Sequence, residues 1–240
     1  MQVNKTFGNR VYVKLDPPND HIERVPGIRI EIDTSYEPEK HLTRTGTVVA
    51  VPEKLIYKRG SDYMEWKTEM ELQVGDRVVM YYLAVYNCIK NGAYEKDYEY
   101  YHGKRSDKYE EFVYMKYQNI YAAIRNGKVI PINGYVLVEP IDDPVLAHKK
   151  KEAEGKKIQL VVEGKPNNTH AVYGRIVYIG TPNKEYIESY LSDENIDVKV
   201  GDEVIMKRIS DIPMEYEYHA KVDGGRKLFR LQRHEILSVL

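Results

Sequence analysis

The stretch that decides the fold is residues 74–80, VGDRVVM, which returns as VGDEVIM at residues 200–206. In both copies a glycine that tolerates a positive φ precedes an aspartate that can bond to nearby backbone. The apolar run that follows is typical of a strand. The recurrence of a turn and a strand about 126 residues apart indicates an internal duplication.

Two more segments recur in the same order and at nearly the same distance. GTVVAV at residues 46–51 returns as GRIVYI at residues 174–179, and GNRVYVK at residues 8–14 returns as NGYVLVE at residues 133–139. A single short match arises easily by chance, whereas three collinear matches are hard to dismiss. The whole chain is therefore predicted to consist of two related copies.

A fourth pair lies closer together and locates an insertion. NIYAAI at residues 119–124 matches EILSVL at residues 235–240 at a distance of about 116 residues. The first copy is thus about ten residues longer, and the tyrosine-rich stretch 91–109 is the predicted insertion. These spacings predict two domains, residues 1–125 and 128–240, which agrees with the usual size range of small domains.

Each copy is predicted to be all-β. Apolar and polar residues alternate with period two at residues 11–15 and 28–32, and glycine, proline, asparagine and aspartate bound these runs. Short strands without long helical periodicity favour small barrels. The one helix-like pattern is at residues 184–191, where apolar residues recur at helical spacing.

The order of these motifs resembles that of the co-chaperonin family typified by GroES. DVKVGDEVI at residues 197–205 and LFRLQRHEILSVL at residues 228–240 are similar to the family's C-terminal segments. In the first copy, PGIRI at residues 26–30 and GTVVAV at residues 46–51 are similar to its N-terminal half. The resemblance covers most of the chain twice, and it implies two tandem GroES-like irregular β-barrels.

The resemblance also implies a binding mode. Members of the family cap a chaperonin ring through a mobile loop that offers a hydrophobic tripeptide, which matches Ile28, Arg29 and Ile30 within the loop 17–44. The family prefers an apolar residue where Arg29 stands. The alternation at residues 28–32 is equally compatible with the inward face of an ordered hairpin.

In the second copy the corresponding loop is residues 142–173. The apolar residues that match the tripeptide region are Ile158, Leu160 and Val161. They follow two lysines where the family has glycines, so this loop departs from the family pattern. Its apolar run is also compatible with a purely structural role.

Two further features are implied by the family's architecture. Roof hairpins are expected at residues 52–72 and 181–196. Subunits of the family join when the N-terminal strand of one pairs with the C-terminal strand of the next, which implies a homo-oligomer. Within this chain, residues 120–124 and 135–138 are expected to pair in the same way and to cover a strand edge.

Composition narrows the function classes. The net charge of −1 disfavours a strongly basic nucleic-acid binder, and one cysteine excludes an intrachain disulfide. The tyrosines of residues 91–109 could stack on bases, but interleaved acidic residues oppose a phosphate backbone, so a subunit or domain contact is favoured. No apolar run approaches the roughly 20 residues of a membrane span. We expect no nucleic-acid partner, no membrane and a cytoplasmic location.

Signals for an enzyme are absent from the sequence. There is no P-loop, no Gly-rich dinucleotide turn, no nucleophile elbow and no His-Glu-x-x-His pattern. Cys88 lies in an apolar run and is expected to be an inert thiol. The sequence therefore predicts a non-enzyme without catalytic residues, metal or cofactor.

The predicted function is that of a co-chaperonin. It would cap a GroEL-like chaperonin ring and enclose an unfolded client protein, while ATP hydrolysis belongs to the ring. The alternative is a structural or assembly protein, such as a phage virion or scaffold component, built from the same paired barrels.

Overall fold

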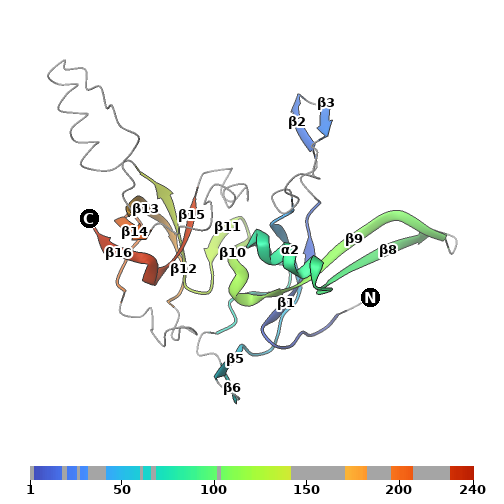
Figure 1. The fold of residues 1–240 in the computed structure, drawn as a ribbon, viewed down its shortest axis with the longest axis horizontal. Helices are drawn as coiled ribbons and strands as arrows, with labels where there is room; N and C mark the ends of the chain where they lie inside the picture. Colours follow the sequence, from blue (N-terminus) through green and yellow to red (C-terminus); the bar gives the residue numbers. More distant parts are fainter. Residues whose placement is uncertain are drawn as a thin grey trace.

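A computed structural model describes residues 3–17, 21–25, 28–31, 42–59, 62–65, 69–101, 104–141, 171–182, 196–207 and 228–240 (Figure 1). The described chain is mostly β-strand. The first half contains β1 (Arg10–Leu15), β2 (His21–Val25), β3 (Ile28–Glu31), β4 (Thr45–Ala50), β5 (Ile56–Arg59), β6 (Asp62–Glu65), β7 (Arg77–Met80), α2 (Tyr82–Lys90), β8 (Tyr94–Tyr101), β9 (Lys104–Lys116), the 3-10 turn η1 (Tyr117–Asn119) and β10 (Ile120–Arg125). The rest contains β11 (Lys128–Pro131), β12 (Tyr135–Pro140), β13 (Ala171–Ile179), β14 (Glu203–Lys207), β15 (Phe229–Gln232), the 3-10 turn η5 (Arg233–Glu235) and β16 (Ile236–Val239).

Two antiparallel sheets contain strands in the same spatial order. The larger sheet runs β11-β10-β7-β4-β1-β9-β8, and the smaller runs β15-β12-β13-β14-β16. We call β9-β1-β4-β7-β10 the first strand set and β15-β12-β13-β14-β16 the second strand set. The two sets match strand for strand. A register shift in the β1–β4 pair, between Tyr12 and Val13, recurs in the matching β12–β13 pair, between Leu137 and Val138.

The Val-Gly-Asp turn is built identically in both sets. Gly75 has a φ of +93° and Gly201 one of +97°, a conformation that L side chains rarely adopt. The carboxylate of Asp76 accepts the backbone N–H of Gln73 at 2.8 Å, and the carboxylate of Asp202 accepts that of Lys199 at 2.8 Å. This side-chain bond closes the turn, which is why the motif needs an aspartate after the glycine.

Alternating strand residues form the two cores. Val11 and Val13 of β1 are fully buried, as are the matching Val136 and Val138 of β12. Met80 and Met206, at the ends of the recurring motif, are buried members of the two core clusters. Strand residues of the opposite parity lie on the other face of each sheet, as the pleat requires, and some of them, such as Tyr12 and Leu137, are buried as well.

The all-β prediction is confirmed at the level of secondary structure, apart from the helix α2. Neither sheet closes on itself among the described strands, because the outer strands β11 and β8, and likewise β15 and β16, do not pair with each other. Helix α2 was not predicted from the sequence, although Tyr82, Val85 and Ile89 lie at helical spacing. The helix-like pattern at 184–191 lies outside the described residues.

The strand that covers β10 differs from the predicted one. Residues 135–138 were expected to pair with residues 120–124, whereas β10 pairs with β11, from Arg125 opposite Lys128 to Ala122 opposite Pro131. Asn126 and Gly127 form the connection, with φ of +51° and +74°. An Asn-Gly pair is the preferred two-residue hairpin turn, so local turn geometry selects the nearer strand.

Two small hairpins lie apart from the sheets. The β2–β3 pair interrupts the connection from β1 to β4, and the β5–β6 pair interrupts the connection from β4 to β7. They extend from opposite sides of the first strand set (Figure 1).

Candidate binding loop and strand-set junction

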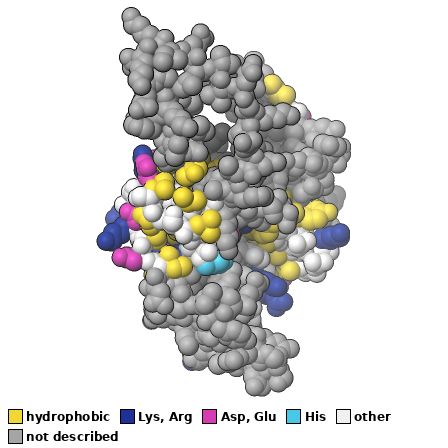
Figure 2. Space-filling view, turned by 60° about the vertical axis from the view of Figure 1, so that its left-hand side comes forward, with side chains coloured by type: hydrophobic (Ala, Val, Ile, Leu, Met, Phe, Trp, Pro, Cys, Tyr) yellow, Lys and Arg dark blue, Asp and Glu magenta, His cyan; other side chains and the backbone are white. Residues whose placement is uncertain are grey.

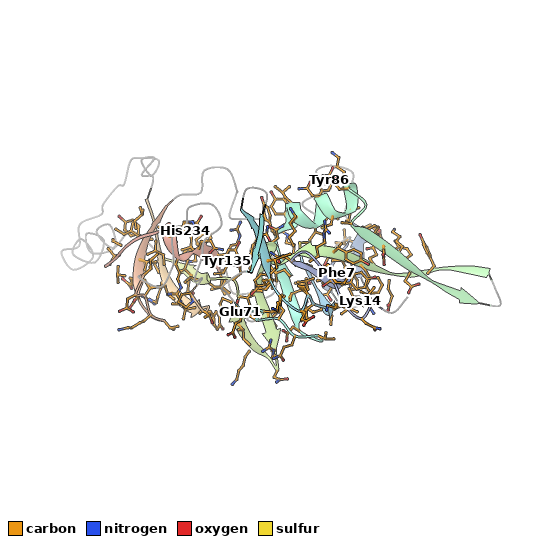
Figure 3. The ribbon with its side chains drawn as sticks, turned by 90° about the horizontal axis from the view of Figure 1, so that it is seen from below. Phe7, Lys14, Glu71, Tyr86, Tyr135 and His234 are labelled. Carbon is orange, nitrogen blue, oxygen red and sulfur yellow. The ribbon has the colours of Figure 1, made fainter. Side chains whose placement is uncertain are left out.

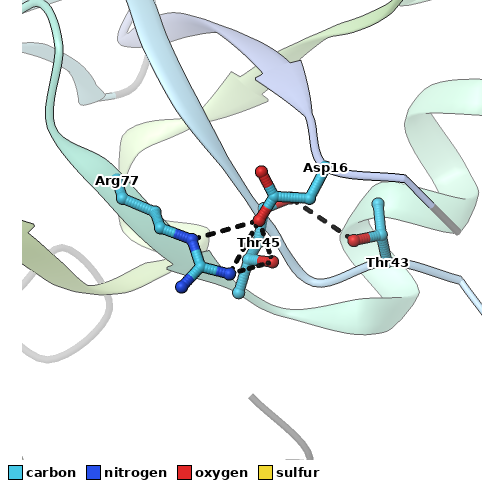
Figure 4. A network of polar contacts seen from close by, with 4 residues as sticks. All are labelled: Asp16, Thr43, Thr45 and Arg77. Atoms are coloured by element: carbon cyan, nitrogen blue, oxygen red, sulfur yellow. Dashed lines mark hydrogen bonds and ion pairs between the residues drawn. The ribbon is translucent and has the colours of Figure 1, made fainter. Parts of the chain in front are cut away.

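The connection between β1 and β4 leaves the sheet from a tightly bonded root. A carboxylate oxygen of Asp16 accepts the hydroxyl of Thr45 and two bonds from Arg77, at 3.1 Å from Nε and 2.9 Å from Nη2 (Figure 4). The backbone N–H of Asp16 also donates to the carbonyl of Thr45 at 3.0 Å. Both ends of the connection are therefore held to β7, and the residues between them start from a fixed base.

The predicted tripeptide lies in the hairpin that this connection carries. Ile28, Arg29 and Ile30 are the first three residues of β3, with Ile30 opposite Ile22 in β2. Ile30 is 51% exposed. An exposed isoleucine on a hairpin apart from either core does not contribute to the packing of the sheets. The expectation of an inward-facing core hairpin is thus not met at Ile30.

The second connection begins in a comparable way but with different chemistry. The backbone N–H of Ile141 donates to the carbonyl of Tyr173 at 3.1 Å, which matches the bond between Asp16 and Thr45. Nearby, Arg175 and Glu203 form an exposed ion pair at 2.7 Å. The predicted contacts Ile158, Leu160 and Val161 lie outside the described residues.

The two strand sets meet at a junction lined with aromatic rings. The Tyr121 and Tyr135 ring centroids lie 5.0 Å apart, and the guanidinium of Arg230 lies 4.4 Å from the Tyr121 centroid. Leu137 and Leu228 pack on Ala122 beside it. The second strand set thus uses its β12 and β15 side to cover β10 of the first.

A half-buried carboxylate ties this junction together. Glu71, which is labelled in Figure 3, comes from the segment before β7. Its carboxylate accepts the hydroxyl of Tyr117 at 2.7 Å and the backbone N–H of Asn133 at 2.6 Å. Burial raises the pKa of Glu71, and the bonds from Tyr117, Asn133 and the Thr181 hydroxyl offset that rise only in part. Because these partners come from both halves of the chain, Glu71 links the halves.

The matching surface at the C-terminal end of the molecule is uncovered. Tyr121 in β10 is 4% exposed, whereas Leu237, at the matching position of β16, is 54% exposed. Val239 and Leu240 are similarly exposed, and hydrophobic side chains gather on the side turned forward in Figure 2. The C-terminal strand therefore presents an apolar edge where β10 presents a covered one.

Several of these features were not predicted from sequence. The bonds of Asp16 to Arg77 and of Glu71 to Asn133 join residues separated by more than 60 positions. No spacing pattern signals such contacts. The Asn-Gly pair before β11 was a usable signal.

Neither similarity to known proteins nor a metal-binding arrangement assigns a function to the described chain. No protein-family model matches the chain, and no curated protein is significantly similar to it. Across the described residues, no group of three His, Cys, Asp or Glu side chains is arranged to hold a metal ion. No described helix has the length and apolarity to cross a bilayer.

Proposed function

We propose that the protein is a co-chaperonin that caps a chaperonin ring and assists ATP-dependent folding of an unfolded client without hydrolysing ATP itself. The observation that carries the proposal is the β2–β3 hairpin, which holds exposed Ile30 away from both cores on a root clamped by Asp16 and Arg77. The resemblance to GroES-like co-chaperonins assigns the tripeptide Ile28, Arg29 and Ile30 to the ring contact.

Capping of this kind needs no catalytic side chain. Each hairpin offers one or two apolar anchors, so a single contact is weak and can be released. Several hairpins on one assembly raise the overall affinity by multivalency. A fixed root limits the volume that each hairpin explores, which increases its effective concentration near the ring.

The proposed assembly consists of tandem GroES-like barrels. In this proposal residues 1–125 and 128–240 are the two barrel domains, the protein acts in the cytoplasm, and copies join head to tail. The N-terminal segment that matches β11 would pair with the open edge of β16. Exposed Leu237 and Val239 support this arrangement, because their counterparts Tyr121 and Ala123 are covered within the chain.

The test is capture by a GroEL-type chaperonin ring in the presence of ATP. Wild type should bind, and Ile30→Asp should weaken binding at least tenfold because a charge cannot enter an apolar groove without a large desolvation cost. Val200→Asp is the matched control, since Val200 is also exposed but lies in the turn before β14. Equal binding by the Ile30→Asp variant and the wild type would contradict the proposal.

A second candidate is favoured by the uncovered ends alone. A structural or assembly protein built from the same strand sets would also need head-to-tail contacts but would not need the exposed Ile30. Assembly of the purified chain that is unaffected by Ile30→Asp, together with no capture by any chaperonin, would favour this candidate.

A further inference from the structure

The β8–β9 hairpin is an arm that the core of the first strand set does not require. Only residues 112–116 of β9 pair with β1, and the preceding part pairs with β8 alone. β8 has eight residues and β9 has thirteen. The arm reaches away from the sheets at the end of the molecule that carries the N-terminus, opposite the C-terminus (Figure 1).

The second strand set has a shorter chain at the corresponding place. Met115 of β9 follows Met80 by 35 positions, whereas the matching Leu231 of β15 follows Met206 by only 25. The arm is therefore specific to the first set in its full length. A function of the full-length arm would therefore be confined to the first strand set.

Aromatic and charged side chains contact one another across the arm. The ammonium of Lys96 lies 4.1 Å from the Tyr109 ring centroid and 3.3 Å from Glu111, and the Tyr98 and Tyr109 centroids are 5.3 Å apart. Tyr109 is nevertheless 44% exposed. Exposed tyrosines are typical of protein interfaces, because they add contact area at little entropic cost.

The other face of the arm's base is also aromatic. The ring of Tyr12 in β1 stacks on Phe112, with centroids 5.1 Å apart, and lies tilted against Tyr114, with centroids 4.6 Å apart. Glu95 accepts the hydroxyls of Tyr12 and Tyr114. The three aromatic residues Tyr12, Phe112 and Tyr114 occupy the positions that Leu137, Leu228 and Arg230 occupy in the second strand set. Those three contact the first set at the internal junction.

The internal junction therefore indicates which surface the β1 and β9 side of the first strand set would contact. Inside the chain, the β12 and β15 side covers the outward face of β10. In the first strand set, the side that corresponds to β12 and β15 is formed by β1 and β9 and carries the arm. In the second strand set, the face that corresponds to the outward face of β10 lies on β16 and is uncovered. From this continuity we infer that the β8–β9 arm clasps the second strand set of another copy of this chain.

The inference rests on the head-to-tail assembly in the proposed function and gives the arm a physical role in it. Inside one chain the hairpin connection at Asn126 and Gly127 tethers the two sets, so their junction forms at high effective concentration. Between copies no such tether exists, and contacts alone must offset the lost freedom of two molecules. An added arm supplies that area at the untethered junction only.

The test compares self-association of the full chain by sedimentation over a range of concentrations. Tyr98→Ser combined with Tyr109→Ser should weaken association about tenfold or more, as loss of interface aromatics does. Tyr86→Ser, on the surface of α2, is the matched control and should leave association unchanged. An unaltered thermal transition in the double variant establishes that its fold is intact. Unchanged association, or a chain that is monomeric throughout, overturns the inference.

A cross-linking arm identifies the surface that is touched. With Tyr109→benzoylphenylalanine in a mixture of 15N-labelled and unlabelled chains, light should join labelled to unlabelled copies at residues 196–207 or 228–240. Cross-links confined to one copy, or formed only with an added chaperonin, overturn the inference. Capture of the chaperonin is scored separately with Ile30→Asp, so failure of the arm and failure of the capping proposal give different patterns.

Discussion

Ile132, in the link to the second strand set, is fully buried in the core of the first strand set, whereas Phe7, at the matching position before β1, is 73% exposed. Both residues precede a turn with two consecutive positive φ values, Gly8 and Asn9 in one case and Asn133 and Gly134 in the other. The same local structure thus has a covered and an uncovered form within one chain. The difference is whether a neighbouring strand set is present.

This pair gives the first prediction. Ile132→Ala should lower the free energy of unfolding by about 2–4 kcal/mol, because it leaves a cavity in the packed core of the first strand set. Phe7→Ala should change it by less than about 0.5 kcal/mol in the isolated chain, as expected for an exposed site. Chemical denaturation measures both. Phe7→Ala should instead weaken self-association, and a variant that is as unstable as Ile132→Ala would show that Phe7 packs within its own chain.

The paired turns give the second prediction. Asp76 is buried and accepts bonds from Nε and Nη2 of Arg125, each at 2.7 Å. It also accepts the turn bond from the backbone, as Asp202 does in the second strand set. Asp76→Asn should cost about 2–4 kcal/mol because the guanidinium loses its charged partner. Asp202→Asn should cost about 1 kcal/mol, the value of one turn bond. Equal losses in urea denaturation would mean that Arg125 contributes nothing.

These two comparisons show what the sequence could predict. The Val-Gly-Asp motif predicted the turn before β7 and β14, because both the glycine's φ and the aspartate's bond are local requirements. Period-two alternation likewise predicted β1, and the match of residues 133–139 to residues 8–14 predicted β12. Burial of Ile132 but not Phe7 could not be predicted, because it depends on which partner strand set is present and not on the residues around it.

Helix α2 shows a different limit. The apolar run that ends β7 continues into the helix without a break, so a strand pattern and a helix pattern overlap from Val78 to Tyr86. The Ile28–Ile30 alternation was ambiguous for a related reason. Alternation indicates that one face of a strand is apolar, but only tertiary placement decides whether that face meets a core or, as at Ile30, solvent.

The third prediction concerns pH. Burial raises the folded-state pKa of Glu71 above its ordinary value of 4.5, so folding favours the protonated acid. Its contribution to stability is complete below the ordinary pKa and is lost as the pH rises through the folded value. Glu71→Gln keeps an uncharged acceptor and removes this loss. The stability of the variant relative to wild type should therefore increase between pH 4 and pH 8, measured by denaturation at each pH, and a constant difference would argue against a buried charge at Glu71.

The fourth prediction concerns the strand that anchors the binding loop. A Cβ added at Gly46 would overlap the backbone carbonyl oxygen of Lys14 and lie 2.7 Å from Val13 Cγ1, so β1 and β4 would have to separate. At the matching Gly174 the nearest atom is the flexible end of Met206 at 2.6 Å, and the backbone oxygen of Glu139 is 3.3 Å away.

Gly46→Ala should therefore cost about 2–3 kcal/mol, and Gly174→Ala about 1 kcal/mol or less, since a methionine side chain can move where a strand backbone cannot. Because Gly46 follows Thr45 at the root, the first change should also speed hydrogen exchange at the Asp16 amide, whose acceptor is the Thr45 carbonyl. The Gly174→Ala variant should leave that exchange rate unaltered. If Gly46→Ala destabilises the fold while the Asp16 amide stays protected, the root of the loop does not depend on close pairing of β1 and β4, and the clamp by Arg77 is sufficient to hold it.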